Sequence, residues 1–168
     1  MMRLLKISLI FLLVLSVCLS LCSCFARDFH CGELTVTLDA FFFELDTERE
    51  GVSMCLASTA GMTVIFIRES LSDLAKVGID GESTACEYAE LLRETAPNGA
   101  GEVIALEGGV GYFEYENSVN GVCYRYFAYC YKAKEAFFAV QFAMADEDTE
   151  RLSDSVKRYA ATVRIEGE

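Results

Sequence analysis

Apolar and polar residues are arranged differently near the start of the chain and in the rest of it. Residues 7–21 carry no charge and follow two basic residues, Arg3 and Lys6. An apolar stretch of about 15 residues is shorter than the roughly 20 that a membrane-spanning helix needs, but it has the length of a secretory signal core. Because the basic end stays in the cytoplasm while the apolar stretch enters the bilayer, the pattern predicts that the rest of the chain is exported.

Alternating apolar residues predict three strands in the next part of the chain. The segments 33–38 and 52–58 alternate between apolar and small or polar residues, as a strand with one buried face does. The acidic residues within 44–50 indicate an exposed turn between them. The segment 62–70 is apolar on both faces over most of its length, which is typical of a central strand covered on both sides.

Two helices are predicted after these strands. Ser70 and Thr84 are each followed three residues later by an acid, which is the spacing of a capping box. Gly78 is expected to end the first helix, and the "APNG" turn at 96–99 is expected to end the second. Both helices carry apolar residues at helical spacing, so each has one face that can pack on a sheet.

The second half of the chain predicts more strands and a closing helix. The strands are expected at 102–106, 110–116, 122–132 and 136–144, with a hairpin at 117–121. A short last strand at 162–166 is expected to finish the same sheet. A helix is expected over 146–161, because apolar residues recur at i, i+4, i+7 and i+11: Leu152, Val156, Tyr159 and Val163. Strands followed by helices, then antiparallel strands and a helix, indicate an α+β fold. The segments 124–131 and 137–144 are apolar on both faces, so the antiparallel β-sheet should have helices on both faces.

The end of the apolar leader carries the most specific motif. The residues "LCSC", 21–24, resemble the lipobox of bacterial lipoprotein signals, with Cys22 where a serine, alanine or threonine is usual. The resemblance implies that Cys24 receives a diacylglyceryl group and becomes the first mature residue. Two alternatives stay open: cleavage that releases a secreted protein starting at Arg27, and a signal anchor that is not cleaved.

This assignment divides the chain into three parts. Residues 1–23 form the lipoprotein signal peptide, 24–32 a short tether, and 33–168 a single α+β domain. The only proline is Pro97, so the chain has no proline-rich stalk, and the domain should lie close to the membrane.

The acidic composition limits the choice of partners. Acidic residues outnumber lysine and arginine by 26 to 14, which gives a formal net charge of −12. Such a surface repels phosphate, so nucleic-acid binding and an electrostatic membrane patch are both disfavoured. Contact with the membrane is therefore expected through the N-terminal lipid.

Five cysteines follow the lipid site, an odd number, so at least one thiol should be unpaired in a monomer. An exported chain permits disulfides, and the sequence leaves the state of these cysteines open. None of them forms a CxxC motif, and the two nearest in sequence lie on one predicted strand with their side chains on opposite faces. The five are Cys31, Cys55, Cys86, Cys123 and Cys130.

Few residues can support catalysis. His30 is the only histidine and lies in the predicted tether beside a cysteine, so a serine triad or a histidine-rich zinc site is excluded. Glu114 and Glu116 lie on one face of a predicted strand, and paired carboxylates can perform acid–base chemistry. These two residues support the alternative function, a secreted carboxylate-dependent hydrolase.

The acidic and glycine-rich segments have structural explanations. The segment 146–150 lacks the glycine and the glutamate that an EF-hand requires, and Asp146 is expected to cap the following helix. The turn at 44–50 is a weaker calcium candidate. The "GGVGY" segment at 108–112 precedes a strand, whereas a phosphate-binding loop precedes a helix. No catalytic, cofactor or metal residue is therefore assigned.

Aromatic residues of two neighbouring strands are the one feature with potential to bind a ligand. Tyrosines on a sheet face can stack on a ligand or line a cleft, but they also lie commonly at the edge of a core with their hydroxyls in water. Both interpretations stay open. The residues are Tyr112, Phe113, Tyr115, Tyr124, Tyr126, Phe127, Tyr129 and Tyr131.

Several segments resemble the PsbP-like and DcrB-like family. These are "LTVTLDAFFFELD" near the start, "GYFEYENSVNGVCYRYFAYCYKAKEAFFAVQFAM", and the closing amphipathic helix. The resemblance covers about residues 33–166 and implies an α-β-α sandwich. Members of this group share a fold and no common chemistry, so the resemblance implies no ligand residues.

The sequence thus predicts an extracytoplasmic lipoprotein, anchored to the cell membrane through Cys24. Its domain is expected to be a non-enzymatic binding or accessory module, with an envelope protein or a small molecule as partner. No cofactor is expected.

Overall fold

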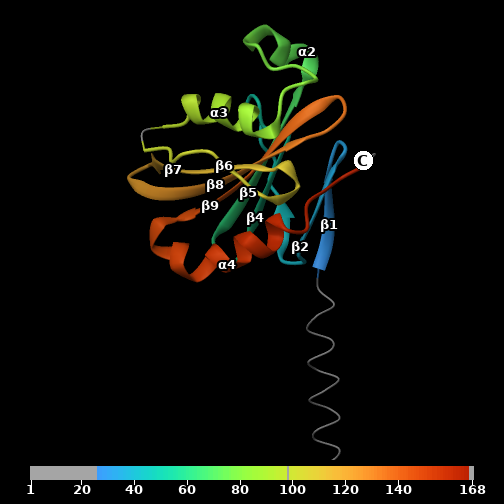
Figure 1. Cartoon of the computed structure of the whole chain (residues 1–168). Helices are drawn as coiled ribbons and strands as arrows, with labels where there is room; N and C mark the ends of the chain where they lie inside the picture. The colour runs from blue at the N-terminus through green and yellow to red at the C-terminus, as the bar shows by residue number, and fades with distance from the viewer. Residues whose placement is uncertain (1–25, 98, 167–168) are drawn as a thin grey trace, which may run out of the picture.

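The computed structural model describes residues 26–97 and 99–166, which form two antiparallel sheets and three α-helices (Figure 1). The larger sheet has seven strands. In sheet order these are β3 (Phe42–Glu44), β4 (Met54–Ser58), β5 (Met62–Ser70), β9 (Ala136–Ala145), β8 (Val122–Lys132), β7 (Gly111–Val119) and β6 (Ile104–Ala105). The smaller sheet has the order β1 (Ala26–Cys31), β2 (Leu34–Asp39) and β10 (Arg164–Ile165).

Helices lie on both faces of the larger sheet, as predicted. One face carries α2 (Leu71–Leu74), which continues into the 3₁₀ turn η1 (Ala75–Val77), and α3 (Ala85–Thr95). The other face carries α4 (Thr149–Ala160) together with the smaller sheet (Figure 1). The structure therefore confirms the α+β class and the layered arrangement. Two further 3₁₀ turns are η2 (Glu107–Gly109) and η3 (Asp146–Asp148).

The central strand β9 divides the core into two parts. Every residue from Ala136 to Met144 is buried, because side chains of alternate residues enter the core on each face. Phe138 and Phe142 pack toward α4 and the smaller sheet, whereas Phe137 packs toward α3. Because β9 contributes side chains to the core on both faces of the sheet, its sequence is a continuous apolar run.

The position of α3 depends on a cap and on a glycine. The Thr84 side chain accepts a hydrogen bond from the Glu87 backbone, and the Glu87 carboxylate accepts one from the Thr84 backbone, so the predicted capping box is confirmed. Gly111 of β7 lies directly under the helix, where a Cβ would be 2.5 Å from the carbonyl oxygen of Ala85. The absence of a side chain at Gly111 thus lets α3 approach the sheet closely.

The prediction of a tether over 24–32 is wrong for most of that segment. Residues Ala26–Cys31 form β1 and pair with β2 along its whole length. Phe29 and Cys31 are buried in the core, while His30 between them is exposed, which is the alternation of a strand at the edge of a sheet. The first strand therefore begins at Ala26, and only Phe25 separates it from the predicted lipid site, Cys24.

Three smaller expectations also need correction. The last strand, β10, pairs with β2 in the smaller sheet and does not extend the larger one. Asp146 does not cap α4, because it begins η3 and its carboxylate accepts hydrogen bonds from Arg125. The expected strand at 102–106 is reduced to the two residues of β6.

The five cysteines of the domain are free thiols in the structure, two of them buried. Burial raises the pKa of the Cys31 and Cys130 thiols, so both are held in the neutral form. Cys123 is exposed at the far end of the strand that holds Cys130. Within residues 26–97 and 99–166, no helix has the length and apolar character needed to cross a membrane.

Candidate functional site

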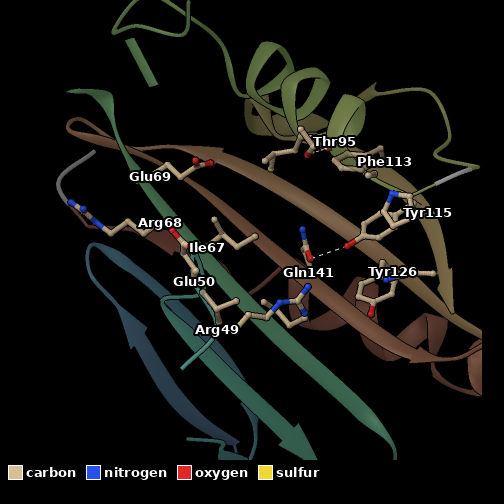
Figure 2. Close-up of a pocket in the computed structure, with 17 residues that line it drawn as sticks. Arg49, Glu50, Ile67, Arg68, Glu69, Thr95, Phe113, Tyr115, Tyr126 and Gln141 are labelled. Carbon is tan, nitrogen blue, oxygen red and sulfur yellow. Dashed lines mark hydrogen bonds between the residues drawn. The ribbon is translucent and has the colours of Figure 1, made fainter. Parts of the chain in front are cut away.

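A cavity of about 460 Å³ lies on the sheet face that α3 only partly covers (Figure 2). The helix packs mainly on β7, β8 and β9, so Ile65 and Ile67 of the neighbouring β5 stay partly exposed. These isoleucines and strands β7–β9 form the floor, the end of α3 forms one wall, and the 49–52 loop forms the other. The cavity thus exists because α3, with 11 residues, is too short to cover the whole sheet.

A single buried amide lies in the floor of this cavity. Gln141 of β9 is only 9% exposed and is surrounded by apolar residues of the same strand. The Tyr115 hydroxyl donates a hydrogen bond to its side-chain oxygen over 3.0 Å. Figure 2 shows the amide nitrogen directed away from that bond, and it has no hydrogen-bond partner among the described residues. Two donor hydrogens of the amide are therefore free for a ligand.

Two stacked tyrosines lie beside Gln141 in the floor of the cavity. The rings of Tyr115 on β7 and Tyr126 on β8 are 4.5 Å apart between centroids and 9° from parallel. They are partners in the register of the two strands. Burial raises the pKa of both hydroxyls, and the nearby charge of Arg49 partly opposes that rise. The tyrosines are therefore neutral at physiological pH and present a flat aromatic surface.

A cation without an ion-pair partner faces the tyrosines. Arg49 comes from the loop between β3 and β4 and extends toward Tyr126 and Gln141 (Figure 2). Among the described residues it forms no salt bridge, whereas Arg68 at the same cavity is held by Glu33 at 3.0 Å. In a chain with a net charge of −12, an arginine left free beside a cavity is a candidate ligand-binding group.

No family model matches the chain, and no curated protein matches it. Among solved structures, the chain is similar to cyanobacterial PsbP (CyanoP) from Synechocystis sp. PCC 6803, with a TM-score of 0.57 and 12% identity over 83% of this chain and 92% of that one. The domain has a PsbP-like fold. The family resemblance in its strand motifs is thereby confirmed at the level of the fold.

Two other structures resemble the PsbP-like domain. A protein from Bacteroides thetaiotaomicron VPI-5482 has a TM-score of 0.53 and 14% identity over 86% of this chain, which spans 50% of that protein. LpqN, involved in cell envelope biogenesis of Mycobacterium tuberculosis, has a TM-score of 0.49 and 16% identity over 83% of this chain and 90% of that one. The similarity to the Bacteroides protein, at 14% identity, describes the fold and identifies no site.

Five members of the aromatic series line one of two cavities in the PsbP-like domain. Tyr129 and Tyr131 lie on the opposite sheet face and line a second cavity of about 630 Å³ beside α4 and β10. Most of its lining is apolar, including Val110, Val163 and Ile165. The smaller cavity is the better candidate site, because there an amide, a guanidinium and a pair of stacked rings converge.

The carboxylates of the hydrolase alternative do not form a catalytic pair. Arg125 of β8 binds Glu116 at 2.6 Å and Asp146 at 3.0 Å, and it approaches Glu114 at 3.9 Å. The Tyr112 hydroxyl also donates to Glu114. These acids surround a partly exposed arginine on the surface of the sheet and do not line either of the two cavities. The hydrolase alternative therefore loses its geometric basis.

The remaining sequence candidates do not assemble into a site. His30 lies 2.9 Å from the Thr35 hydroxyl across strands β1 and β2, while Cys31 points into the core, so the two form no dyad. No group of three or more histidine, cysteine or acidic side chains in the described part of the chain could hold a metal ion, including the turns at 44–50 and 146–150. Cys24 lies outside the described residues, so its lipidation stays a prediction.

Two of the four residues that converge in the cavity were not identified from the sequence. Tyr115 and Tyr126 belong to the predicted aromatic series, but Arg49 was part of an acidic turn and Gln141 part of a strand that reads as core. The one signal was a single polar residue within "AFFAVQFAM", since an uncharged polar side chain in a buried strand needs a partner.

Proposed function

We propose that this protein is an extracytoplasmic lipoprotein whose domain is a non-enzymatic binding module. In this proposal Cys24 carries the lipid, and the cavity under α3 takes a small, planar, anionic molecule. The observation that carries it is the convergence of Arg49, the free amide of Gln141 and the stacked tyrosines on one cavity. Two carboxylates, Glu50 and Glu69, also line the cavity, and Glu69 accepts a hydrogen bond from the Tyr88 hydroxyl at 2.7 Å. Among the described residues, no serine, cysteine or histidine lines it, which favours binding over nucleophilic catalysis.

Each group of the cavity matches one part of such a ligand. The neutral rings of Tyr115 and Tyr126, with Ile65 and Ile67, offer an apolar surface to a flat ligand. The Arg49 guanidinium can bind a carboxylate with two parallel hydrogen bonds. The amide of Gln141 can donate to an acceptor atom on the ligand. Because the whole protein is acidic, Arg49 supplies the local positive charge that an anion requires.

The proposal predicts that the cavity distinguishes a charged ligand from an uncharged one of the same shape. Suitable probes are 2-naphthoate and its uncharged amide, 2-naphthamide. We expect the naphthoate to bind more tightly to the full chain, and Arg49→Gln to weaken its binding about tenfold, because a charge-assisted bidentate contact is lost. The binding of naphthamide should barely change. Isothermal titration calorimetry of the protein in detergent, with empty micelles subtracted, measures both.

Arg93→Gln is the matched control. Arg93 lies on α3 outside the cavity and pairs with Glu90 on the helix surface, so its removal changes the net charge equally without touching the cavity. Equal weakening of naphthoate in both variants would show a general charge effect and contradict the proposed site. Equal affinity of the wild type for naphthoate and naphthamide would also contradict it.

A further inference from the structure

Three exposed apolar side chains follow one edge of the larger sheet. Phe41 is 46% exposed, Phe43 49% and Leu45 39%, whereas Phe42 between the first two is 2% exposed. They lie on or beside β3, which is the edge strand of this sheet. Large aromatic side chains that stay half exposed on both sides of a buried one mark a surface that contacts something apolar.

This edge lies close to the point where the chain leaves the domain. Ala26, the first residue of β1, is the register partner of Asp39, and Phe41 follows two residues later. Strand spacing and chain geometry place the Cα atoms of Ala26 and Phe41 within about 13 Å of each other. Figure 1 shows the start of β1 and the end of β2 at one end of the molecule, with α2 at the opposite end.

We propose that Phe41 and Phe43 contact the membrane surface and orient the domain on it. The inference rests on the proposed lipidation of Cys24, because only Phe25 would then separate the lipidated residue from the first strand. So short a connection holds that end of the domain at the depth of the lipid headgroups. Phenyl rings at this depth transfer from water to the boundary between headgroups and acyl chains, and this transfer of apolar surface out of water is favourable.

The charges of the domain favour an apolar contact over an electrostatic one. Asp39, the charged residue nearest to Phe41 in the chain, is paired with Arg158 at 3.2 Å and also accepts a hydrogen bond from Tyr159. The acids of the chain segment 44–50 follow Phe43. Glu44, the first of them, is the next residue on β3, so its side chain points to the opposite face of the strand from Phe43. Phe41 and Phe43 can therefore meet the bilayer while the acids stay in water.

The orientation can be measured because the chain contains no tryptophan. We would introduce one indole at a time, as Phe41→Trp and Phe43→Trp, into the full chain and reconstitute the lipidated protein in phosphatidylethanolamine–phosphatidylglycerol vesicles. Both sites are about half exposed, so the larger ring fits. In vesicles with bromines on the acyl chains near the headgroup, we expect the indole emission to fall by about half or more.

Val77→Trp is the control. Val77 is 58% exposed in η1, which follows the far end of β5, so it should lie away from the bilayer and show no quenching. Absence of quenching at Phe41 and Phe43 while mass spectrometry finds the lipid on Cys24 overturns the membrane contact and leaves the lipoprotein assignment intact. Dimers in detergent together with unquenched indoles would assign this edge to a second copy and also overturn it. An unmodified Cys24 would contradict both the lipoprotein assignment and the membrane contact.

Discussion

The variant Phe142→Ala should lose about 3–5 kcal/mol of unfolding free energy, a large part of the 5–15 kcal/mol typical of a domain. Phe142 lies on β9 and is 0% exposed. Its ring packs edge-on against Tyr129, with centroids 5.9 Å apart, and beside Tyr159 at 6.4 Å. Alanine would leave a cavity between the sheet and α4. The sheet or the helix would have to move to close this cavity. Urea unfolding followed by circular dichroism measures the loss.

Phe43→Ala is the matched control for this prediction. The same atoms are removed, but Phe43 is 49% exposed at the edge of the sheet. We expect its loss to stay within about 0.5 kcal/mol in detergent, where no bilayer is present. Similar losses in the two variants would contradict the burial that the structure assigns to them.

The variant Gly111→Ala should be the second strongly destabilised one. A Cβ at this position would be 2.5 Å from the carbonyl oxygen of Ala85 and 2.9 Å from the Cβ of Ala89, so α3 must move away from β7. Overpacking of this kind costs about 1–3 kcal/mol. Because the end of α3 forms one wall of the cavity, the affinity for 2-naphthoate should fall as well. The same unfolding and calorimetric measurements check both effects.

Gly101→Ala is the matched control, because an added Cβ at this glycine meets the backbone of β7 without a clash. A Cβ there would be 3.6 Å from the carbonyl oxygen of Glu114, which is an ordinary contact. We expect a change within about 0.5 kcal/mol and no loss of naphthoate binding. A stable Gly111→Ala variant with unchanged binding would show that α3 does not pack against β7 as described.

The parts of the fold that the sequence predicted depend on local signals. The capping box at Thr84 and Glu87 uses residues three positions apart, and it sets the start of α3 correctly. The run from Ala136 to Met144 is apolar on both faces, and it indicates a central strand regardless of the strands beside it. Local patterns of this kind do not depend on long-range contacts, which explains why they could be read directly.

The missed elements depend on contacts between distant segments. β1 has only two buried side chains, Phe29 and Cys31, so its alternation is too short to distinguish it from a tether. Asp146 looked like a helix cap because its partner Arg125 lies 21 residues earlier in the chain. The smaller sheet likewise joins the first and last strands of the domain.

The candidate site could be predicted only in part. Its pair of stacked tyrosines comes from adjacent strands of one hairpin, so Tyr115 and Tyr126 were identified as residues with binding potential. Gln141 joins them through the register of β9 with β5 and β8, and Arg49 joins them because the 49–52 loop lies beside the part of the sheet that α3 leaves uncovered. Neither the register of distant strands nor the part of a sheet left uncovered by a helix can be obtained from residue patterns.

The lipid on Cys24 is the central claim of this account, because both the location of the domain and its orientation on the bilayer depend on it. The most direct measurement is the mass of the N-terminal peptide of the processed protein isolated from membranes. We predict a chain that begins at Cys24 and carries a diacylglyceryl group on the sulfur of this residue. In the variant Cys24→Ser the mass of this group should be absent. An unmodified terminus at Arg27, or an intact leader starting at Met1, would contradict the account.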